Sequence, residues 1–366
     1  MQRRRFLKNS LKTLGAGAAG VVAAPFVSTA SAQETITWDM VTSWPKNFPA
    51  LGTGANEFAQ RVEALSHGRM RIRVHGAGEL VPALEVFDAV AAGTAEMGHS
   101  ASYYWRGKVA AAQFFTAVPF GMNTTETNAW IYYGGGQALW DEIYAKHNLK
   151  PFAVGNTGAQ MAGWFKKEIN SLADMQGLKL RLPGLAGEAM NRIGVTTVNM
   201  PGSEIFTSMQ TGVLDAADWV GPYNDLAFGL HQVADYYYTS AWNEPSAILE
   251  GTVNLDAWNA LPDDLKGVVT EAARASNLAM ISEFTYRNAQ ALETLVDEHG
   301  VQLRTFPEDV MVALFGASEE VIQEQVANDP DSAKAYASYQ AFQTLVRPFS
   351  DAGEFEYLRA RAAVGA

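Results

Sequence analysis

Apolar side chains follow two different periods along the first part of the chain. Residues 35–44, TITWDMVTSW, alternate apolar and polar positions, which is typical of a half-buried strand. Residues 49–66 repeat their apolar positions at three- and four-residue steps, which predicts an amphipathic helix. A strand pattern then follows over 70–74 and a helix pattern over 82–92, and residues 95–105 are typical of a strand that runs into a loop. This βαβαβ order predicts a parallel sheet with helices on its faces.

A second set of elements begins near residue 150. The stretch 151–165, PFAVGNTGAQMAGWF, predicts two short strands around a glycine turn. Further strands are predicted at 178–184, 194–200 and 213–219, a helix at 203–212, and C-terminal helices at 263–297, 307–328 and 331–349. We therefore predict an α/β fold of two lobes with a helical C-terminal region. The ligand cleft should lie between the lobes, because the carboxyl ends of strands in open α/β sheets face the ligand crevice.

The first 32 residues have the three parts of an export signal. Residues 3–8, RRRFLK, fit the twin-arginine pattern, an apolar stretch follows over 14–27, and Ala30-Ser31-Ala32 is an A-x-A cleavage signal. An uncleaved membrane anchor is the alternative, although a run this short and rich in Gly and Ala spans a bilayer poorly. We predict a twin-arginine signal peptide over 1–32 and an exported, periplasmic protein that starts at Gln33.

Composition and motif content exclude several kinds of partner and chemistry. The formal net charge of −12 leaves no basic surplus to neutralise phosphates, so we expect no nucleic-acid partner. The absence of cysteine excludes disulfides, thiolate metal sites and cysteine nucleophiles. The six histidines are scattered without an HExxH spacing, and neither a Walker A sequence nor a G-x-S-x-G elbow is present. We therefore expect no enzymatic activity and no catalytic residues.

Two predicted strands end in residues with binding chemistry. Arg181 lies near the end of the alternating stretch LKLRL. Its planar guanidinium could bind a carboxylate through two hydrogen bonds. Alternatively, it could be a solvated arginine on the polar face of the strand. Asp218 and Trp219 end the strand 213–219. The carboxylate could hold a hard cation and the indole could wall a ligand, or the pair could be a capping aspartate beside a core tryptophan.

Other candidates lie in predicted turns and loops. Gln160 follows a glycine turn, and its amide could contact a ligand or a metal; a surface glutamine is the alternative. Glu244 precedes a proline, which favours an extended backbone, and it could equally be a surface glutamate. Tyr103 and Tyr104 belong to an aromatic run after a strand, which ordinary packing also explains.

Several long stretches resemble the solute-binding proteins of TRAP transporters, the DctP-type family. They are AGELVPALEVFDAVAAGTAEMGHSASYYWRGK, AVPFGM, YYGGGQALWDEIYAKHNL, GNTGAQMAGWFKKEINSLADMQGLKLRLPG and DAADWVGPYNDLAFG. Within that family the chain is similar to the metal-assisted 2-oxo-acid branch, the branch of the α-keto-acid-binding protein TakP. The Trp-Val-Gly-Pro form at 219–222 marks this branch, whereas Asp218 stands where the branch has glutamate.

The resemblance implies a role for each candidate residue. Arg181 would clamp the substrate carboxylate, and Gln160 would touch both the ligand and one bound cation, sodium or calcium. Asp218, Trp219 and Glu244 would complete the metal site, with Trp219 also facing the substrate. The substrate-binding residues would further include Tyr103 and Tyr104, from the first lobe.

The resemblance also implies limits for the lobes. Lobe I would comprise 33–152 and about 246–290, lobe II 153–245 and about 291–330, and 331–366 would be a helical extension. That extension has apolar residues at Tyr336, Tyr339, Phe342, Leu345 and Val346. This stripe could dock a second copy and form a homodimer, or it could pack on its own lobes.

The function implied is that of a periplasmic binding protein for a small monocarboxylate, such as the 2-oxo acid pyruvate. It would deliver its ligand to the membrane permease subunits of a TRAP transporter. Two alternatives remain at this point. One is a TRAP binding protein for another organic acid, such as lactate or a sugar acid, and the other is an exported metal-assisted enzyme acting on an organic acid.

Overall fold

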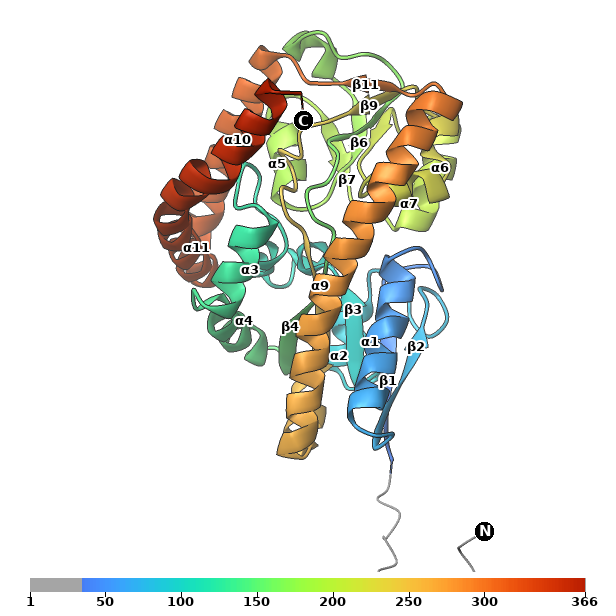
Figure 1. The fold of residues 1–366 in the computed structure, drawn as a ribbon, viewed down its shortest axis with the longest axis vertical. Helices are drawn as coiled ribbons and strands as arrows, with labels where there is room; N and C mark the ends of the chain where they lie inside the picture. The colour runs from blue at the N-terminus through green and yellow to red at the C-terminus, as the bar shows by residue number, and fades with distance from the viewer. Residues whose placement is uncertain (1–34, 366) are drawn as a thin grey trace, which may run out of the picture. The chain divides into compact units, whose positions relative to one another are not determined.

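The computed structural model describes residues 35–365 (Figure 1). The predicted signal peptide, residues 1–32, lies outside this range. Within the described residues, no helix combines the length and apolar character that crossing a bilayer would take. The strands form two sheets, which we call sheet A and sheet B.

Sheet A has the strand order β2-β1-β3-β10-β4. Its strands are β1 (Ile36–Thr42), β2 (Met70–His75), β3 (Met97–Ser100), β4 (Leu149–Asn156) and β10 (Ile248–Asn254). β1 pairs in parallel with β2 and β3, which confirms the predicted βαβαβ unit, but β10 runs antiparallel to both β3 and β4. Sheet A is therefore mixed, with the predicted parallel strands at one side and the antiparallel β10 beside them. The antiparallel strand comes from much later in the chain, where no local pattern connects it to the first unit.

Helices cover both faces of sheet A. They include α1 (Leu51–Leu65), α2 (Val86–Ala91), α3 (Thr124–Tyr132), α4 (Gly136–Ala145) and α8 (Leu255–Ala260), with the 3-10 helices η1 (Ser102–Trp105) and η2 (Ala110–Phe115). Alternate residues of β1 enter different cores, because successive side chains of a strand point to opposite faces. Met40 packs in a cluster with Phe58 of α1, whereas Val41 packs in a cluster with Phe115 and Trp140.

Sheet B has the order β11-β9-β5-β8-β6-β7. Its strands are β5 (Gly163–Phe165), β6 (Lys179–Arg181), β7 (Thr196–Val198), β8 (Ala216–Ala217), β9 (Tyr236–Tyr238) and β11 (Gln302–Arg304), accompanied by α5 (Gly184–Arg192), α6 (Gly202–Gln210), α7 (Pro222–Ala227), η3 (Leu172–Met175) and η4 (Leu230–Gln232). The two strands predicted in 151–165 both exist, but β4 belongs to sheet A and β5 to sheet B. The glycine turn between them is thus a crossover from one sheet to the other.

Two crossovers and one long helix connect the sheets. The chain passes from β4 to β5 over 157–162 and returns from β9 to β10 over 239–247. Helix α9 (Asp263–Glu293), followed by the π-helical turn η5 (Thr294–Glu298), packs on β4 and α1 of one half and on α7 of the other (Figure 1). The strands of sheet A lie within 36–156 and 248–254, and those of sheet B lie within 163–238 and 302–304. The exact limits of the two lobes remain a prediction.

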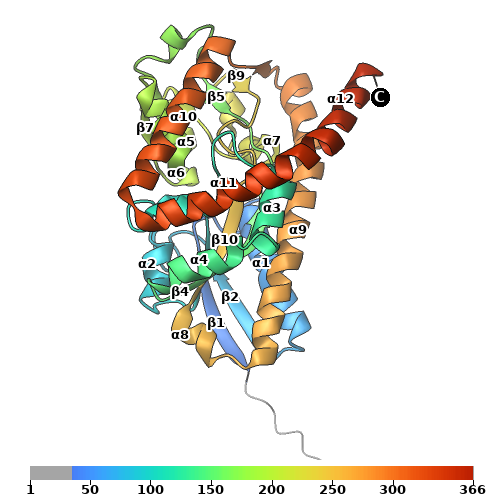
Figure 2. The same ribbon diagram turned by 90° about the vertical axis from the view of Figure 1, so that its left-hand side faces the viewer.

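The C-terminal helices divide into a packed and an exposed part. They are α10 (Glu308–Asn328), α11 (Pro330–Ser350), the π-helical turn η6 (Asp351–Phe355) and α12 (Glu356–Ala363). Tyr336 and Tyr339 are buried, and Phe342 and Val346 pack against the same core, so most of the predicted stripe contacts its own half of the molecule. Residues 351–365 are exposed throughout, and Figure 2 shows α12 extending away from the body.

One acidic side chain, Glu250 on the inner strand β10, is buried in sheet A with no cationic partner among residues 35–365. Its carboxylate accepts hydrogen bonds from the hydroxyls of Ser102, Tyr144 at 2.7 Å and Thr252 at 2.6 Å. Burial raises the pKa of Glu250 to about 7, although the three hydroxyl donors favour the charged form. The folded protein therefore holds a proton that the unfolded chain releases at lower pH.

This difference in protonation between the folded and unfolded chain predicts that stability depends on pH. The variant Glu250→Gln separates this contribution from those of other titrating groups. Between the ordinary glutamate pKa and about 7, folded Glu250 is protonated and the unfolded residue is ionised. The free energy of unfolding of the parent protein should fall across this window as the pH rises, by roughly 3 kcal/mol. The neutral glutamine lacks this contribution, so the variant should gain stability relative to the parent with rising pH. Urea titrations from about pH 4 to 8 measure the difference, and parallel curves would contradict it.

Candidate functional site

The structure brings all of the predicted site residues together between the two sheets. Arg181 ends β6 and Asp218 and Trp219 follow β8, both in sheet B. Gln160 and Glu244 lie one on each crossover, and the backbone N–H of Gln160 donates to the carbonyl of Glu244 at 3.1 Å. The remaining two residues, Tyr103 and Tyr104, come from η1 at the end of β3 in sheet A, with ring centroids 4.9 Å apart.

Arg181 is fully buried, which excludes the alternative of a solvated arginine. Its Nε donates to the Met200 carbonyl at 3.3 Å, Nη1 to the Asp218 carbonyl at 2.9 Å, and Nη2 to the Tyr104 hydroxyl at 3.2 Å. A guanidinium has five N–H groups, so one remains on each terminal nitrogen. Two such groups on one planar fork match the two oxygens of a carboxylate. The local sequence produces this geometry, because Leu180 and Leu182 fill the core on the opposite face of the strand.

Carboxylate and amide oxygens close to Arg181 are buried without hydrogen-bond donors. They are Oε1 of Gln160, Oδ2 of Asp218, and both carboxylate oxygens of Glu244. The Tyr103 hydroxyl faces Glu244 and favours its charged form, but the contact does not reach hydrogen-bond geometry. Buried acceptors normally have a partner, so several without a protein donor in the same place fit a positively charged ligand.

The two carboxylates are electrostatically unfavourable as a pair. Burial raises the pKa of Asp218 to about 7, which Arg181 counteracts and Asp225 reinforces. Burial, with the neighbouring charge of Asp218, also raises the pKa of Glu244 well above its usual range. A cation between the two groups would remove this penalty, since it would neutralise both charges.

The oxygen donors suit a hard cation. In the described part of the chain, no group of three or more His, Cys, Asp or Glu residues could hold a metal ion. Two carboxylates with amide and carbonyl oxygens are a donor set for sodium or calcium, whereas zinc and other transition metals favour imidazole or thiolate ligands. The indole N–H of Trp219 is a donor and binds no cation, so only the backbone carbonyl of this residue could be a ligand.

Trp219 forms one wall of the site. Its ring lies 5.1 Å from the Arg181 guanidinium carbon and makes an edge contact with Trp44 at 6.2 Å between centroids. On another side, a Cβ added at Gly202 would lie 2.4 Å from the outer edge of the indole. The ring is therefore held by packing around it, which is the property expected of a rigid wall.

Sequence reasoning missed two contributors to the site. Asn243 donates from Nδ2 to the Asp218 carboxylate at 3.2 Å, and its own Oδ1 has no partner, so it is a further candidate cation ligand. Its position directly before Glu244 was the available signal. Trp44, which follows β1, is fixed by a 2.7 Å hydrogen bond from its indole N–H to Nδ1 of His99. No local pattern pointed to Trp44, because its neighbours in the site come from elsewhere in the chain.

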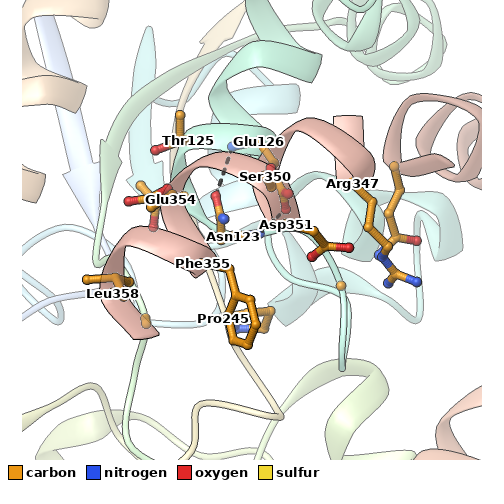
Figure 3. Close-up of a pocket in the computed structure, with 14 residues that line it drawn as sticks. Asn123, Thr125, Glu126, Pro245, Arg347, Ser350, Asp351, Glu354, Phe355 and Leu358 are labelled. Atoms are coloured by element: carbon orange, nitrogen blue, oxygen red, sulfur yellow. Dashed lines mark hydrogen bonds between the residues drawn. The ribbon is translucent and has the colours of Figure 1, made fainter. Parts of the chain in front are cut away.

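A separate pocket of about 480 Å³ lies between the start of α3 and the C-terminal helices (Figure 3). Asn123 and Glu126 form a capping box at the N-terminus of α3, drawn as a dashed line in the figure. The pocket touches the two crossovers through Ala159 and Pro245, the sequence neighbours of Gln160 and Glu244. None of the predicted site residues lines it, so it is distinct from the site described above.

The chain is similar to a known protein family, to a relative of known ligand class and to solved structures. Residues 40–329 match the family described as bacterial extracellular solute-binding protein, family 7. A monocarboxylate 2-oxoacid-binding periplasmic protein of Nostoc sp. strain PCC 7120 is 40% identical over 362 residues, which cover 98% of each chain.

Two solved structures are also similar over most of the chain. Both are TRAP periplasmic solute-binding proteins. One from Pseudoalteromonas atlantica, with bound sodium and pyruvate, is 41% identical with a TM-score of 0.87, covering 89% of this chain and 99% of that one. One from Colwellia psychrerythraea, with bound calcium and pyruvate, is 40% identical with a TM-score of 0.87, covering 89% and 100%.

The unpaired oxygens predict that sodium or calcium ions stabilise the protein even without an organic ligand. Binding to the folded state alone should raise the free energy of unfolding by about 3 kcal/mol at roughly one hundred times the Kd. Asp218→Asn and Glu244→Gln should each reduce this gain, because each removes a charged ligand. Thermal unfolding with and without each ion measures the effect, and Glu204→Gln, an exposed change on α6, is the matched control. Equal ion-dependent gains in all four proteins would contradict the assignment.

Proposed function

Because this chain belongs to the bacterial extracellular solute-binding proteins of family 7, we propose that it binds a small 2-oxo acid such as pyruvate, together with one cation, outside the cytoplasm. Proteins of this family serve TRAP transporters by presenting small carboxylates to the membrane permease. They bind and deliver solutes without transforming them, which agrees with the expectation of no enzymatic activity. The alternative of a metal-assisted enzyme is not favoured.

The observation that carries the proposal is the buried, incompletely bonded fork of Arg181 beside unpaired buried oxygens. Pyruvate has about six heavy atoms, and small ligands gain at most about 1.5 kcal/mol per atom. Such a ligand binds tightly only if nearly all of its oxygens are engaged. Arg181 would hold the carboxylate, and a cation held by the buried protein oxygens would attract the remaining oxygens of the ligand.

The same proposal gives a role to each of the remaining candidates. The cation would be held by Gln160, Asp218, Glu244 and the carbonyl of Trp219, with Asn243 as a further candidate. Tyr103 and Tyr104 would close the site from sheet A, and Tyr104 already accepts a hydrogen bond from Arg181. The charges then balance more closely, since Arg181 and the cation face two protein carboxylates and one ligand carboxylate.

Steric considerations favour a small acid over a sugar acid. The Trp219 ring contacts Trp44 and Phe48 at 6.2 and 6.4 Å between centroids, and Arg181 covers its face. A bulky ligand would have to displace these buried aromatic side chains, which would cost contacts on every side. The relatives with bound pyruvate support the same choice.

The direct test is titration calorimetry of pyruvate into the mature protein with saturating sodium or calcium. The parent protein should bind, and removal of the ions should weaken binding sharply. Arg181→Lys keeps the charge but loses the fork, so it should weaken binding by about 100-fold or more.

Two controls make this test specific. Arg287→Lys, an exposed change on α9, should leave the affinity unchanged. Lactate keeps the carboxylate but replaces the keto oxygen by a hydroxyl, so weaker binding of lactate would support an interaction between the cation and the keto oxygen. If neither pyruvate nor any other small carboxylate binds, the proposed ligand class is wrong.

We further propose export through the twin-arginine pathway, which is supported by Arg3, Arg4 and the A-x-A sequence that ends at Ala32. Replacement of both arginines by lysine should retain the precursor in the cytoplasm. N-terminal sequencing of the parent protein in the periplasm should begin at Gln33. An unprocessed Met1 in the exported protein would contradict cleavage at this site.

A homodimer through the C-terminal helix is the proposed assembly. The end of α11 and the helix that follows expose Leu345, Phe349, Phe355 and Tyr357, and residues 351–365 are exposed throughout. A helix this short is marginal in water unless it buries an apolar face, and a second copy would supply the missing surface.

Light scattering of the mature protein should therefore give twice the monomer mass. Phe349→Asp combined with Phe355→Asp should give monomers, because charged residues would replace the central apolar contacts. Tyr133→Asp, at another highly exposed aromatic residue, should leave the dimer intact. A monomeric parent protein at micromolar concentration would refute the assembly.

A further inference from the structure

We propose that Glu250, a buried acid of sheet A outside the ligand site, is a positioning residue that holds the turn carrying Tyr103 and Tyr104 against Arg181. The inference rests on the proposed function, because it concerns the part of the site that comes from sheet A. It concerns a residue that touches neither the proposed ligand nor the proposed cation. Its evidence is a set of hydrogen bonds that reach both ends of one turn.

The turn is η1, Ser102–Trp105. At its first residue, the Ser102 hydroxyl donates to Oε2 of Glu250. At its last residue, the Trp105 indole N–H donates to the Tyr144 hydroxyl at 3.0 Å, and that hydroxyl donates to the same Oε2 at 2.7 Å. One oxygen atom therefore anchors both ends of a four-residue turn whose two middle residues are the tyrosines.

A carboxylate suits this position for a specific reason. Above about pH 7 Glu250 is ionised. An ionised carboxylate only accepts hydrogen bonds, so it then fixes the direction of every hydroxyl that contacts it. Tyr144 must then donate to Glu250, which leaves its oxygen free to accept from Trp105. Glu250 is fully buried with no cation beside it in the described part of the chain, and burying a charge in this way is costly. Such a cost is common where a group has a role in function.

The backbone around Glu250 is also irregular. The partners of Leu249 and Glu250 on β4 are Gly155 and Ala153, so the pairing skips Val154 at this point. A β-bulge of this kind changes the direction in which side chains point, and bulges are enriched beside binding sites. On its other side Glu250 pairs with Ser100 of β3, two residues before the turn.

The turn contacts Trp44 and Phe87 of its own half, and its two tyrosines also reach residues of the other half. The Tyr104 hydroxyl accepts a hydrogen bond from Arg181, and the side chain of Tyr103 packs over Gly184 at the start of α5, where an added Cβ would lie 3.3 Å from it. If the turn shifted, Arg181 would lose a partner and the tyrosines would no longer close the site. The cation ligands would be affected less, because they lie on sheet B and the crossovers and only Glu244 faces Tyr103.

The test compares three variants that change the Glu250 carboxylate or one of its hydrogen-bond donors. Glu250→Leu removes the acceptor for both ends of the turn. Glu250→Gln keeps an oxygen for Ser102 and Tyr144 and can donate its amide to Thr252. Thr252→Val is the matched control, because it removes a hydrogen bond to Oε1 of the same carboxylate without touching the turn.

Three measurements separate positioning from general destabilisation. They are hydrogen exchange of residues 101–106 in the ligand-free protein, calcium affinity without organic acid, and pyruvate affinity with saturating calcium. Glu250→Leu should accelerate exchange in the turn and weaken pyruvate binding by about tenfold or more, with a much smaller loss of calcium affinity. Glu250→Gln and Thr252→Val should match the parent protein in all three measurements.

Unchanged exchange in the turn of Glu250→Leu would overturn the proposal, as would equal losses of pyruvate and calcium affinity. Failure of the parent protein to bind pyruvate would refute the proposed function alone, since the exchange measurement still decides whether Glu250 holds the turn. If Glu250→Leu does not fold, Ser102→Ala removes one of the two anchors with a smaller change. It should accelerate exchange in the turn, and an unaltered rate would contradict the inference.

Discussion

The burial of the Arg181 guanidinium is the constraint on which the rest of the site depends. A permanent positive charge excluded from water must find acceptors and negative charge in the protein. Two backbone carbonyls and the Tyr104 hydroxyl take three of its N–H groups, and Asp218 and Glu244 lie nearby. These partners come from both sheets and one crossover, so burying one charge requires the two halves to meet.

That requirement accounts for the position of the aromatic side chains. Trp44 and Phe48 follow β1, and they pack against Trp219 and Phe228, which belong to the other half. A hydrogen bond of 2.9 Å from Asn224 of α7 to the Pro49 carbonyl spans the same boundary. Apolar contacts exclude water around the guanidinium, which strengthens its interactions with acceptors and raises the cost of leaving any of them unpaired.

The unpaired carboxylates give the proposed cation its physical basis. Arg181 alone does not satisfy Asp218 and Glu244, since three of its five N–H groups are directed to carbonyls and to Tyr104 and none donates to either carboxylate. Asp218 is one methylene shorter than the glutamate expected at this position, yet its carboxylate is in the site and is held by Asn243 at 3.2 Å. Relatives with sodium and with calcium both contain pyruvate, which agrees with a site that depends on hard oxygen ligands more than on one ion.

Local periodicity in the sequence was enough to identify β1, α1, β2 and β6, because each alternates or repeats over consecutive residues. It also placed Arg181 at the end of a strand, and the resemblance selected the other site residues. The sequence could not show that β10 runs antiparallel inside sheet A, that 151–165 crosses between sheets, or that Asn243 and Trp44 join the site. Those features depend on contacts between segments far apart in the chain. Burial has the same origin: a side chain on the polar face of a strand becomes a buried charge only when another element covers it, and tertiary packing alone decides that.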